Sequence, residues 1–186
     1  MIKVFIVHGF QGAPNSGWKP WLMEECAKQG IYACALSMPS PGSPVPSEWV
    51  EEISRHVDAN KKDPIYLIGH SLGATAILRY LETTKAKNIQ GAVFVSAPVF
   101  KSTKRKVQAF LKKPFDYEAI RARVPKMVVI HGDNDKSVSA DQGKTLAREL
   151  GAKLVLIKNG GHLNGSAGWH KLPQCRDALL GMINGG

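Results

Sequence analysis

A serine flanked by glycines is the first candidate for chemistry in this sequence. Ser71 stands in Gly69-His70-Ser71-Leu72-Gly73, directly after the apolar run 65–68 and before an apolar stretch with helical spacing. In a turn this sharp the serine hydroxyl stands clear of the backbone, and side chains in place of the flanking glycines would collide with neighbouring chain. The pattern and its setting predict a nucleophile elbow with Ser71 as the nucleophile, although the pentapeptide alone is a weak signal.

A base is the second requirement, because a serine hydroxyl is a poor nucleophile until its proton is removed. With this kind of elbow the order along the chain is Ser, then Asp or Glu, then His, each on a loop after a later strand. His162 follows the apolar run 154–157 and is the favoured base, while His170, at the start of the expected last helix, is its rival. The other four histidines are expected beside the serine but directed away from it, within a helix, or at the ends of earlier strands: His70, His56, His8 and His131.

The acid that orients this histidine is one of two aspartates. Asp133 and Asp135 both follow the apolar run 127–130. Because they stand two positions apart, one of them can instead brace the turn through an Asx-type hydrogen bond. Asp135 is favoured, on a pattern that a family resemblance supplies.

Backbone N–H groups are expected to stabilise the oxyanion that forms when the serine attacks a carbonyl. One is that of Leu72, directly after the nucleophile, and the other comes from the loop after the first strand, His8-Gly9-Phe10-Gln11-Gly12. Phe10 is the first choice in this loop and Gln11 the second. The glycines of the loop have a simpler explanation too, since they permit a tight strand-to-helix turn.

Six short apolar runs are predicted strands that carry these loops: residues 2–7, about 32–36, 65–68, 92–96, 127–130 and 154–157. Each is nearly continuous in apolar character, as strands buried on both faces of a parallel sheet require. Helical spacing alternates with them at 17–29, 72–82, 138–150 and 169–183, and in a helix with Ser47 as its N-cap. The alternation predicts one α/β domain over residues 1–186, with helices on both faces of the sheet and ligands at the carboxyl ends of its strands.

One basic segment interrupts the alternation. Residues 101–123 combine eight lysines and arginines with aromatic side chains, in a connection longer than a minimal crossover. We expect a small cap at about 98–124. Large aromatic residues that would line an acyl pocket beneath it, if they are not plain core, are Phe100, Phe110, Phe115, Trp18 and Trp169.

The composition narrows the class of protein. At 186 residues, with 44% hydrophobic and 22% charged residues, the chain suits one folded domain. Lysine and arginine exceed aspartate and glutamate by 25 to 15, a net charge of +10, so an anionic partner must be considered. A solvated basic face is the more common explanation, and no nucleic-acid-binding module is recognisable. Specific nucleic-acid binding is therefore not expected.

The location and cofactor content are predicted from what the sequence lacks. The apolar runs are far shorter than the ~18 residues of a membrane-spanning helix, and the first residues do not form a secretory signal. Cys26, Cys34 and Cys175 are odd in number and form no Cys-x-x-Cys, which argues against a disulfide framework and a zinc site. We expect a cytoplasmic protein with no membrane span, no metal and no cofactor.

Together these motifs resemble the α/β-hydrolase superfamily, and within it the small serine hydrolases of the retinoblastoma-binding protein 9 and YdeN-like group. The resemblance runs from His8-Gly9-Phe10-Gln11-Gly12 through the elbow and Ser96-Ala97-Pro98 to Gly161-His162-Leu163-Asn164. In the superfamily the acid usually falls in Gly-x-x-Asp-x-x-Val, which Gly132, Asp135 and Val138 match, and this is the reason for favouring Asp135. The resemblance implies a minimal fold of six parallel strands and cofactor-free hydrolysis of ester or related acyl bonds.

Two functions are therefore weighed. The leading one is a carboxylesterase-like serine hydrolase in which Ser71 attacks, His162 moves the proton and Asp135 orients the histidine, acting on a small acyl substrate whose anionic side would suit the basic segment. The alternative is a protein-interaction module that keeps the fold with little or no catalysis. The intact set of Ser, Asp and His favours the enzyme.

Overall fold

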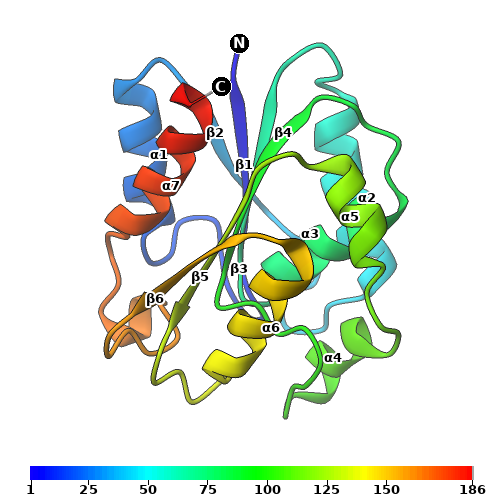
Figure 1. Ribbon diagram of the computed structural model, residues 1–186, viewed down its shortest axis with the longest axis vertical. Coiled ribbons are helices and arrows are strands. Elements are labelled where there is room, and N and C mark those ends of the chain that lie inside the picture. Colours follow the sequence, from blue (N-terminus) through cyan, green and yellow to red (C-terminus); the bar gives the residue numbers. More distant parts are fainter. Residues whose placement is uncertain (186) are drawn as a thin grey trace.

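The computed structural model describes residues 1–185 and holds one six-stranded, fully parallel sheet with helices on both faces (Figure 1). This confirms the predicted fold class. The strands lie in the order β2-β1-β3-β4-β5-β6. Their bounds are β1 Lys3–Val7, β2 Tyr32–Leu36, β3 Ile65–His70, β4 Ile89–Val95, β5 Met127–Gly132 and β6 Lys153–Ile157. The helices are α1 Lys19–Lys28, α2 Pro46–Asp58, α3 Leu72–Thr83, α4 Arg105–Gln108, α5 Tyr117–Arg123, α6 Ala140–Leu150 and α7 Pro173–Asn184, with 3-10 turns η1 Ala109–Leu111 and η2 Gly165–Ala167.

The strand order creates a switch point beside β1. Lys3 of β1 pairs with Tyr32 of β2 on one side and with Ile65 of β3 on the other. The chain thus moves outward to β2, returns across β1 to β3, and then continues in one direction to β6. Because such crossovers are right-handed, this reversal sends α1 and α2 to opposite faces. The crevice that opens at the carboxyl ends of β1 and β3 is where open α/β sheets bind their ligands.

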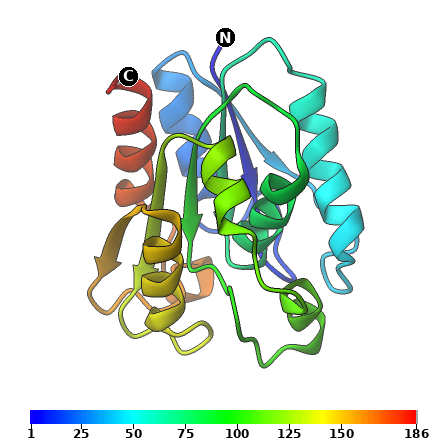
Figure 2. The ribbon, with the colours of Figure 1, turned by 45° about the vertical axis from the view of Figure 1, so that its right-hand side comes forward.

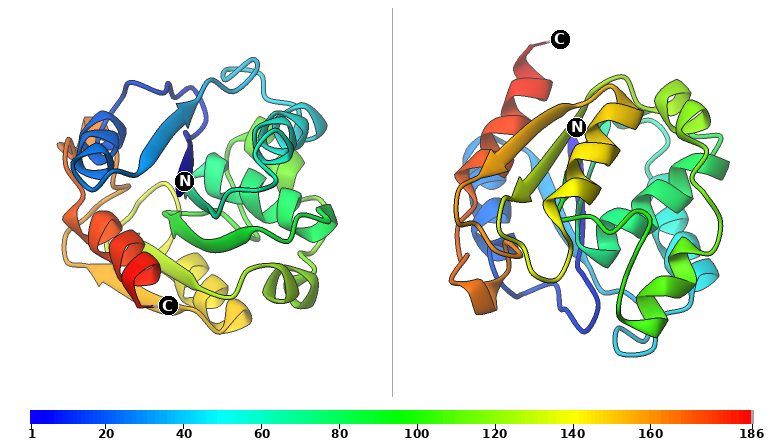
Figure 3. Two further views of the ribbon diagram at one scale, coloured as in Figure 1. Left: turned by 90° about the horizontal axis from the view of Figure 1, so that it is seen from above. Right: turned by 60° about the horizontal axis from the view of Figure 1, so that its bottom comes forward.

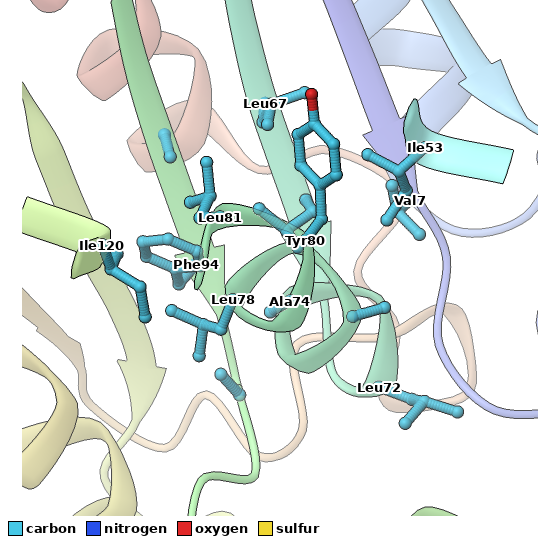
Figure 4. Close-up of a cluster of buried hydrophobic side chains, with 14 of the residues drawn as sticks. Val7, Ile53, Leu67, Leu72, Ala74, Leu78, Tyr80, Leu81, Phe94 and Ile120 are labelled. Atoms are coloured by element: carbon cyan, nitrogen blue, oxygen red, sulfur yellow. The ribbon is translucent and has the colours of Figure 1, made fainter. Parts of the chain in front are cut away.

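Two apolar layers enclose the sheet. On one face it packs against α2, α3, α5 and α6, and on the other against α1 and α7. The end-on view separates these two sets of helices (Figure 3, left). Helix α3 lies at the centre of the larger layer, where its Ala74, Leu78 and Leu81 lie among Leu67 and Phe94 of the strands (Figure 4). The nucleophile loop therefore stands between a buried strand and a buried helix.

Edge strands and helix starts differ from the sequence expectation. The central strand β3 is buried throughout, but β2 and β6 are partly exposed because each has a neighbour on one side only. Ser47 is not an N-cap: α2 already begins at Pro46, which can occupy the first helical turn because its missing N–H has no partner there. The last helix likewise begins at Pro173 rather than near 169, which leaves His170 in the preceding loop.

The predicted cap segment folds onto α3. Phe110, Phe115 and Ile120 of this segment are buried in the larger apolar layer. Arg79 of α3 holds it, since its Nε donates to the Phe110 carbonyl oxygen at 2.9 Å and its guanidinium lies 3.7 Å from the centre of the Phe115 ring. Only the stretch around α4 extends to the carboxyl ends of the strands, far from the chain's N-terminus (Figure 2). Within residues 1–185 no helix is long and apolar enough to cross a membrane.

Candidate active site

The turn between β3 and α3 holds Ser71 in a strained backbone conformation. Its φ is +53° and its ψ is −122°, a region that residues other than glycine rarely adopt. A Cβ on Gly69 would lie 2.3 Å from the Ala74 Cα, and one on Gly73 would lie 2.2 Å from the Val7 carbonyl oxygen. The predicted collisions at both glycines are confirmed. The Ser71 N–H donates to the Val95 carbonyl oxygen at 2.8 Å, which ties the turn to the neighbouring strand.

A chain of hydrogen bonds runs from Ser71 through His162 to Asp135. The Oγ of Ser71 lies 3.0 Å from Nε2 of His162, and Nδ1 of the same ring lies 2.7 Å from Oδ2 of Asp135. The Asp135 side chain is fully buried, whereas that of His162 keeps 16% of its surface exposed. The three side chains come from the loops after β3, β5 and β6, so the structure brings together the residues that the sequence singled out.

The environment of Asp135 favours its charged form. Burial by itself would raise the pKa of this carboxyl, but the hydrogen bond and charge of His162 outweigh it, and the pKa is lowered. Oδ1 also accepts the N–H groups of Ser137 at 2.8 Å and Val138 at 3.0 Å. An ionised Asp135 fixes the imidazole with Nδ1 protonated, which leaves Nε2 as an acceptor toward the Ser71 hydroxyl.

Asp133 has a different contact. Its Oδ1 accepts the Asn159 N–H at 2.8 Å, and Oδ1 of Asn134 accepts the Gly161 N–H at 2.7 Å. Both residues therefore brace the loop that carries His162 rather than its ring. Without the family pattern, the sequence did not decide between the two aspartates. In the structure Asp135 is the one that is hydrogen-bonded to the imidazole.

The loop of His162 is further held by residues to which the sequence analysis gave another role: Trp18 and Trp169 were expected to line the acyl pocket, and His70 to point away from the serine. The Trp18 indole donates to the Leu163 carbonyl oxygen at 2.9 Å, and the Trp169 indole donates to that of Gly160 at 2.7 Å. Nε2 of His70 lies 2.9 Å from the His162 carbonyl oxygen. The contacts of Trp18 and His70 join positions distant in sequence, whereas that of Trp169 lies within one loop. No local sequence pattern predicts any of them.

The remaining histidines are distributed as follows. The ring of His70 packs 5.0 Å from that of His162, and burial lowers its pKa to about 3, so it is neutral. Nε2 of His131 lies 2.9 Å from the Val138 carbonyl oxygen, and Nε2 of His8 accepts the Met38 N–H at 3.3 Å, so both anchor loops as expected. His170 is exposed on the loop before α7.

The backbone N–H groups of Phe10 and Leu72, the two candidate oxyanion donors, form no hydrogen bond with the protein within residues 1–185. The Gln11 N–H, by contrast, donates to the Pro41 carbonyl oxygen at 2.9 Å. Gln11 is thus already engaged. A Cβ on Gly9 would lie 3.0 Å from the Ser71 Cβ, so the first loop passes directly over the nucleophile.

A cavity of about 440 Å³ opens onto Ser71 and His162. Among the aromatic residues predicted to line it, Trp18 does so. The other four do not: Phe110 packs on Trp49 and Phe115 on Arg79 in the core, Phe100 is 51% exposed, and Trp169 instead donates to the Gly160 carbonyl oxygen. Phe10 lines the cavity instead. Within the described chain, no group of three histidine, cysteine or acidic side chains is arranged to hold a metal ion.

Comparison with known proteins assigns the family. A serine hydrolase family model matches residues 4–180. The putative hydrolase YdeN of Bacillus subtilis is 30% identical over 179 residues, covering 95% of this chain and 94% of its own length. The serine hydrolase RBBP9 of Rattus norvegicus is 26% identical, covering 96% and 95%. The crystal structure of the B. subtilis ydeN product superposes with a TM-score of 0.94 at 29% identity over 99% of this chain and all of that one. The chain belongs to the serine hydrolase family.

Proposed function

We propose that this serine hydrolase cleaves carboxylic esters of small molecules, with Ser71 as nucleophile, His162 as general base and acid, and Asp135 as the residue that orients the histidine. The observation that carries the proposal is the position of one imidazole between the hydroxyl and the carboxylate, at 3.0 Å and 2.7 Å. Both distances allow direct proton transfer or hydrogen bonding without rearrangement. A cavity of about 440 Å³ at Ser71 suits a small substrate.

In the first half of the reaction, the Ser71 Oγ attacks the carbonyl carbon of the ester while Nε2 of His162 takes the hydroxyl proton. The tetrahedral intermediate collapses as the bond to the alcohol oxygen breaks, and His162 returns the proton to that oxygen. The alcohol leaves and an acyl-enzyme remains. Asp135 stabilises the imidazolium that exists between the two proton transfers.

In the second half, a water molecule gives its proton to Nε2 of His162 and attacks the acyl carbon. The bond to Ser71 Oγ then breaks, and His162 returns the proton to the serine. The N–H groups of Phe10 and Leu72 are the proposed donors to the oxyanion in both halves, and their freedom from protein acceptors within residues 1–185 supports this role.

The cellular location is part of the proposal. All three cysteines are free, at positions 26, 34 and 175. Free thiols fit a reducing compartment, and we place the enzyme in the cytoplasm.

Intact-mass labelling with a fluorophosphonate tests the proposal, because this reagent reacts with activated serines. We expect one adduct on the wild-type protein and none on Ser71→Ala or His162→Ala. Circular dichroism and size exclusion verify that each variant is folded and monodisperse. A folded wild-type protein that stays unlabelled would contradict the enzymatic function and favour the protein-interaction module.

A further inference from the structure

Lys19 is a buried lysine in the wall of the active-site cavity. It is 5% exposed and lines the same cavity as Ser71 and His162. Its Nζ donates to the Ser16 Oγ at 3.1 Å, and no other hydrogen bond or ion pair of Lys19 exists within residues 1–185. An ammonium group has three N–H donors. Two of them are therefore left without a protein acceptor.

No anionic side chain within residues 1–185 pairs with Lys19, although the centre of the Trp18 ring lies 5.9 Å from its Nζ. The titratable side chains that face it are His8 and His70, and the pKa of each is lowered, chiefly by burial, with the Lys19 charge contributing. Both rings are uncharged near neutral pH. Burial also lowers the pKa of Lys19, to about 8, so that the ammonium form prevails at pH 7. A buried cation with no anion is costly unless something completes its environment.

The position of Lys19 in α1 gives no benefit to the stability of the helix. Lys19 is the first residue of α1, where the partial charge of the helix end is positive. A cation at this end is unfavourable, and an acidic residue would be preferred; the first turn of α1 contains none. The placement of Lys19 works against both burial and helix stability, which points to a use outside the fold.

The rest of the cavity has the same sign of charge. Lys104 and Lys136 line it too, both exposed, and the lining includes neither aspartate nor glutamate. The Nζ of Lys104 lies 5.2 Å from the centre of the Phe10 ring. Neither lysine forms an ion pair within the described chain. A ligand in this cavity meets three cations, one of them buried.

We propose that Lys19 binds a carboxylate of the substrate, so that the enzyme prefers esters that carry a negative charge over neutral esters of the same size. A carboxylate brings one charge and several acceptor sites, which matches one ammonium with two free N–H donors. The exposed lysines at the cavity mouth draw such a substrate inward. This inference rests on the proposed ester hydrolysis at Ser71, and it names the substrate class of that site.

The test compares kcat/KM for charged and neutral esters, with the charge placed on either side of the scissile bond. The first pair is the 4-nitrophenyl monoester of adipic acid and 4-nitrophenyl heptanoate. The second pair is 4-acetoxybenzoate and its methyl ester. We expect the wild-type enzyme to prefer the charged member of at least one pair by about tenfold or more, the usual value of a buried charge-assisted contact.

Lys19→Met removes the charge with little change in side-chain length. We expect it to reduce this preference to about one, by lowering kcat/KM for the charged ester about tenfold while the neutral ester stays within about twofold. Lys62→Met removes the same charge from an exposed site remote from the cavity and is expected to keep the preference. Labelling of Ser71 by a fluorophosphonate shows that each variant has a working nucleophile.

The outcomes separate the two proposals. A folded wild-type protein without a fluorophosphonate adduct would refute ester hydrolysis at Ser71 itself. If the adduct forms and neutral esters are hydrolysed, a wild-type enzyme with no preference in either pair would overturn the role of Lys19, whether or not the variant folds. Equal loss for both members of a pair in Lys19→Met would overturn it as well, since a merely structural role predicts that result.

Discussion

Two parts of the active site differ in how they hold charge. We call floor the Ser71 elbow with His162 and the buried Asp135 behind it, and wall the cavity lining from the start of α1 and around α4, which includes Lys19. At the floor, the buried carboxylate of Asp135 has a partner at each oxygen, His162 on Oδ2 and backbone N–H groups on Oδ1. In the wall, the buried ammonium of Lys19 has one hydrogen bond, to a hydroxyl, a Trp18 ring whose centre lies 5.9 Å from Nζ, and no counter-ion within residues 1–185. A buried charge whose hydrogen bonds are all made by the protein indicates groups that act on one another. A buried charge with unused donors indicates a binding site for a ligand. The difference separates the proposed chemistry from the proposed choice of substrate.

The floor and the wall also differ in what they are built from. The floor is built from close approaches of main chain, such as Gly73 against the Val7 carbonyl oxygen, that admit no side chain at all. The wall contributes side chains at the start of α1 and around α4. Changes at the floor are therefore expected to abolish activity or folding, whereas changes in the wall are expected to alter selectivity.

The largest effect is expected at the nucleophile. Ser71→Ala removes the atom that attacks the ester, and we expect kcat to fall by about 10⁴-fold or more. Initial rates with 4-nitrophenyl butyrate measure the loss, and circular dichroism verifies the fold. Ser54→Ala, on the outer helix α2, is the matched control and is expected to keep full activity. Substantial hydrolysis by the folded Ser71→Ala protein would refute the floor as the site of chemistry.

The two aspartates after β5 offer the next test. Asp135→Asn removes the charge that orients and stabilises the protonated His162, and we expect kcat to fall about 10³- to 10⁴-fold. Asp133→Asn keeps an oxygen that can accept the Asn159 N–H, so we expect a loss of less than about tenfold. The same ester assay compares the two variants. The reverse order of losses would make Asp133 the acid and Asp135 a brace.

A glycine pair tests the packing of the floor. A Cβ on Gly73 meets the Val7 carbonyl oxygen at 2.2 Å, so Gly73→Ala is expected to lower the free energy of unfolding by about 3 kcal/mol. Gly181 lies in α7, where an added Cβ would meet nothing within 4 Å, and Gly181→Ala is expected to raise stability by up to about 1 kcal/mol. Urea unfolding measures both. A tolerated Gly73→Ala would show that the elbow can shift, contrary to the contrast drawn between floor and wall.

The sequence predicted the fold and the membership of the floor better than it predicted the wall. The ends of strands can be predicted because a polar or glycine residue follows each apolar run, as near Gly132 and His70. The order Ser, Asp, His along the chain is a further pattern that predicts which residues form the floor. Helix starts were less accurate, because proline at the first turn replaced the expected cap at Ser47. Lys19 left no signal, since a lysine beside apolar residues in a helical segment is ordinarily solvated. Lys19 lines the same cavity as His70 and Asn164, which only the folded chain brings near.

Among changes in the active site, the smallest effect is expected at Lys19, where the substitution raises the free energy of unfolding instead of lowering it. The folded chain lowers the pKa of this lysine from an ordinary 10.5 to about 8, so below pH 8 the wild-type protein bears the full cost of a buried ammonium. Between those values the unfolded chain binds the proton and the folded chain does not, so this group makes stability rise with pH. Lys19→Met, which has no such cost, is expected to raise the free energy of unfolding at pH 7 by about 1 kcal/mol, and the gain should shrink toward pH 10.5. Urea unfolding at pH 7 and pH 9.5, with Lys62→Met as the control, measures the difference. A destabilised Lys19→Met would mean that the lysine serves the fold, and the contrast between floor and wall would then lose its physical basis.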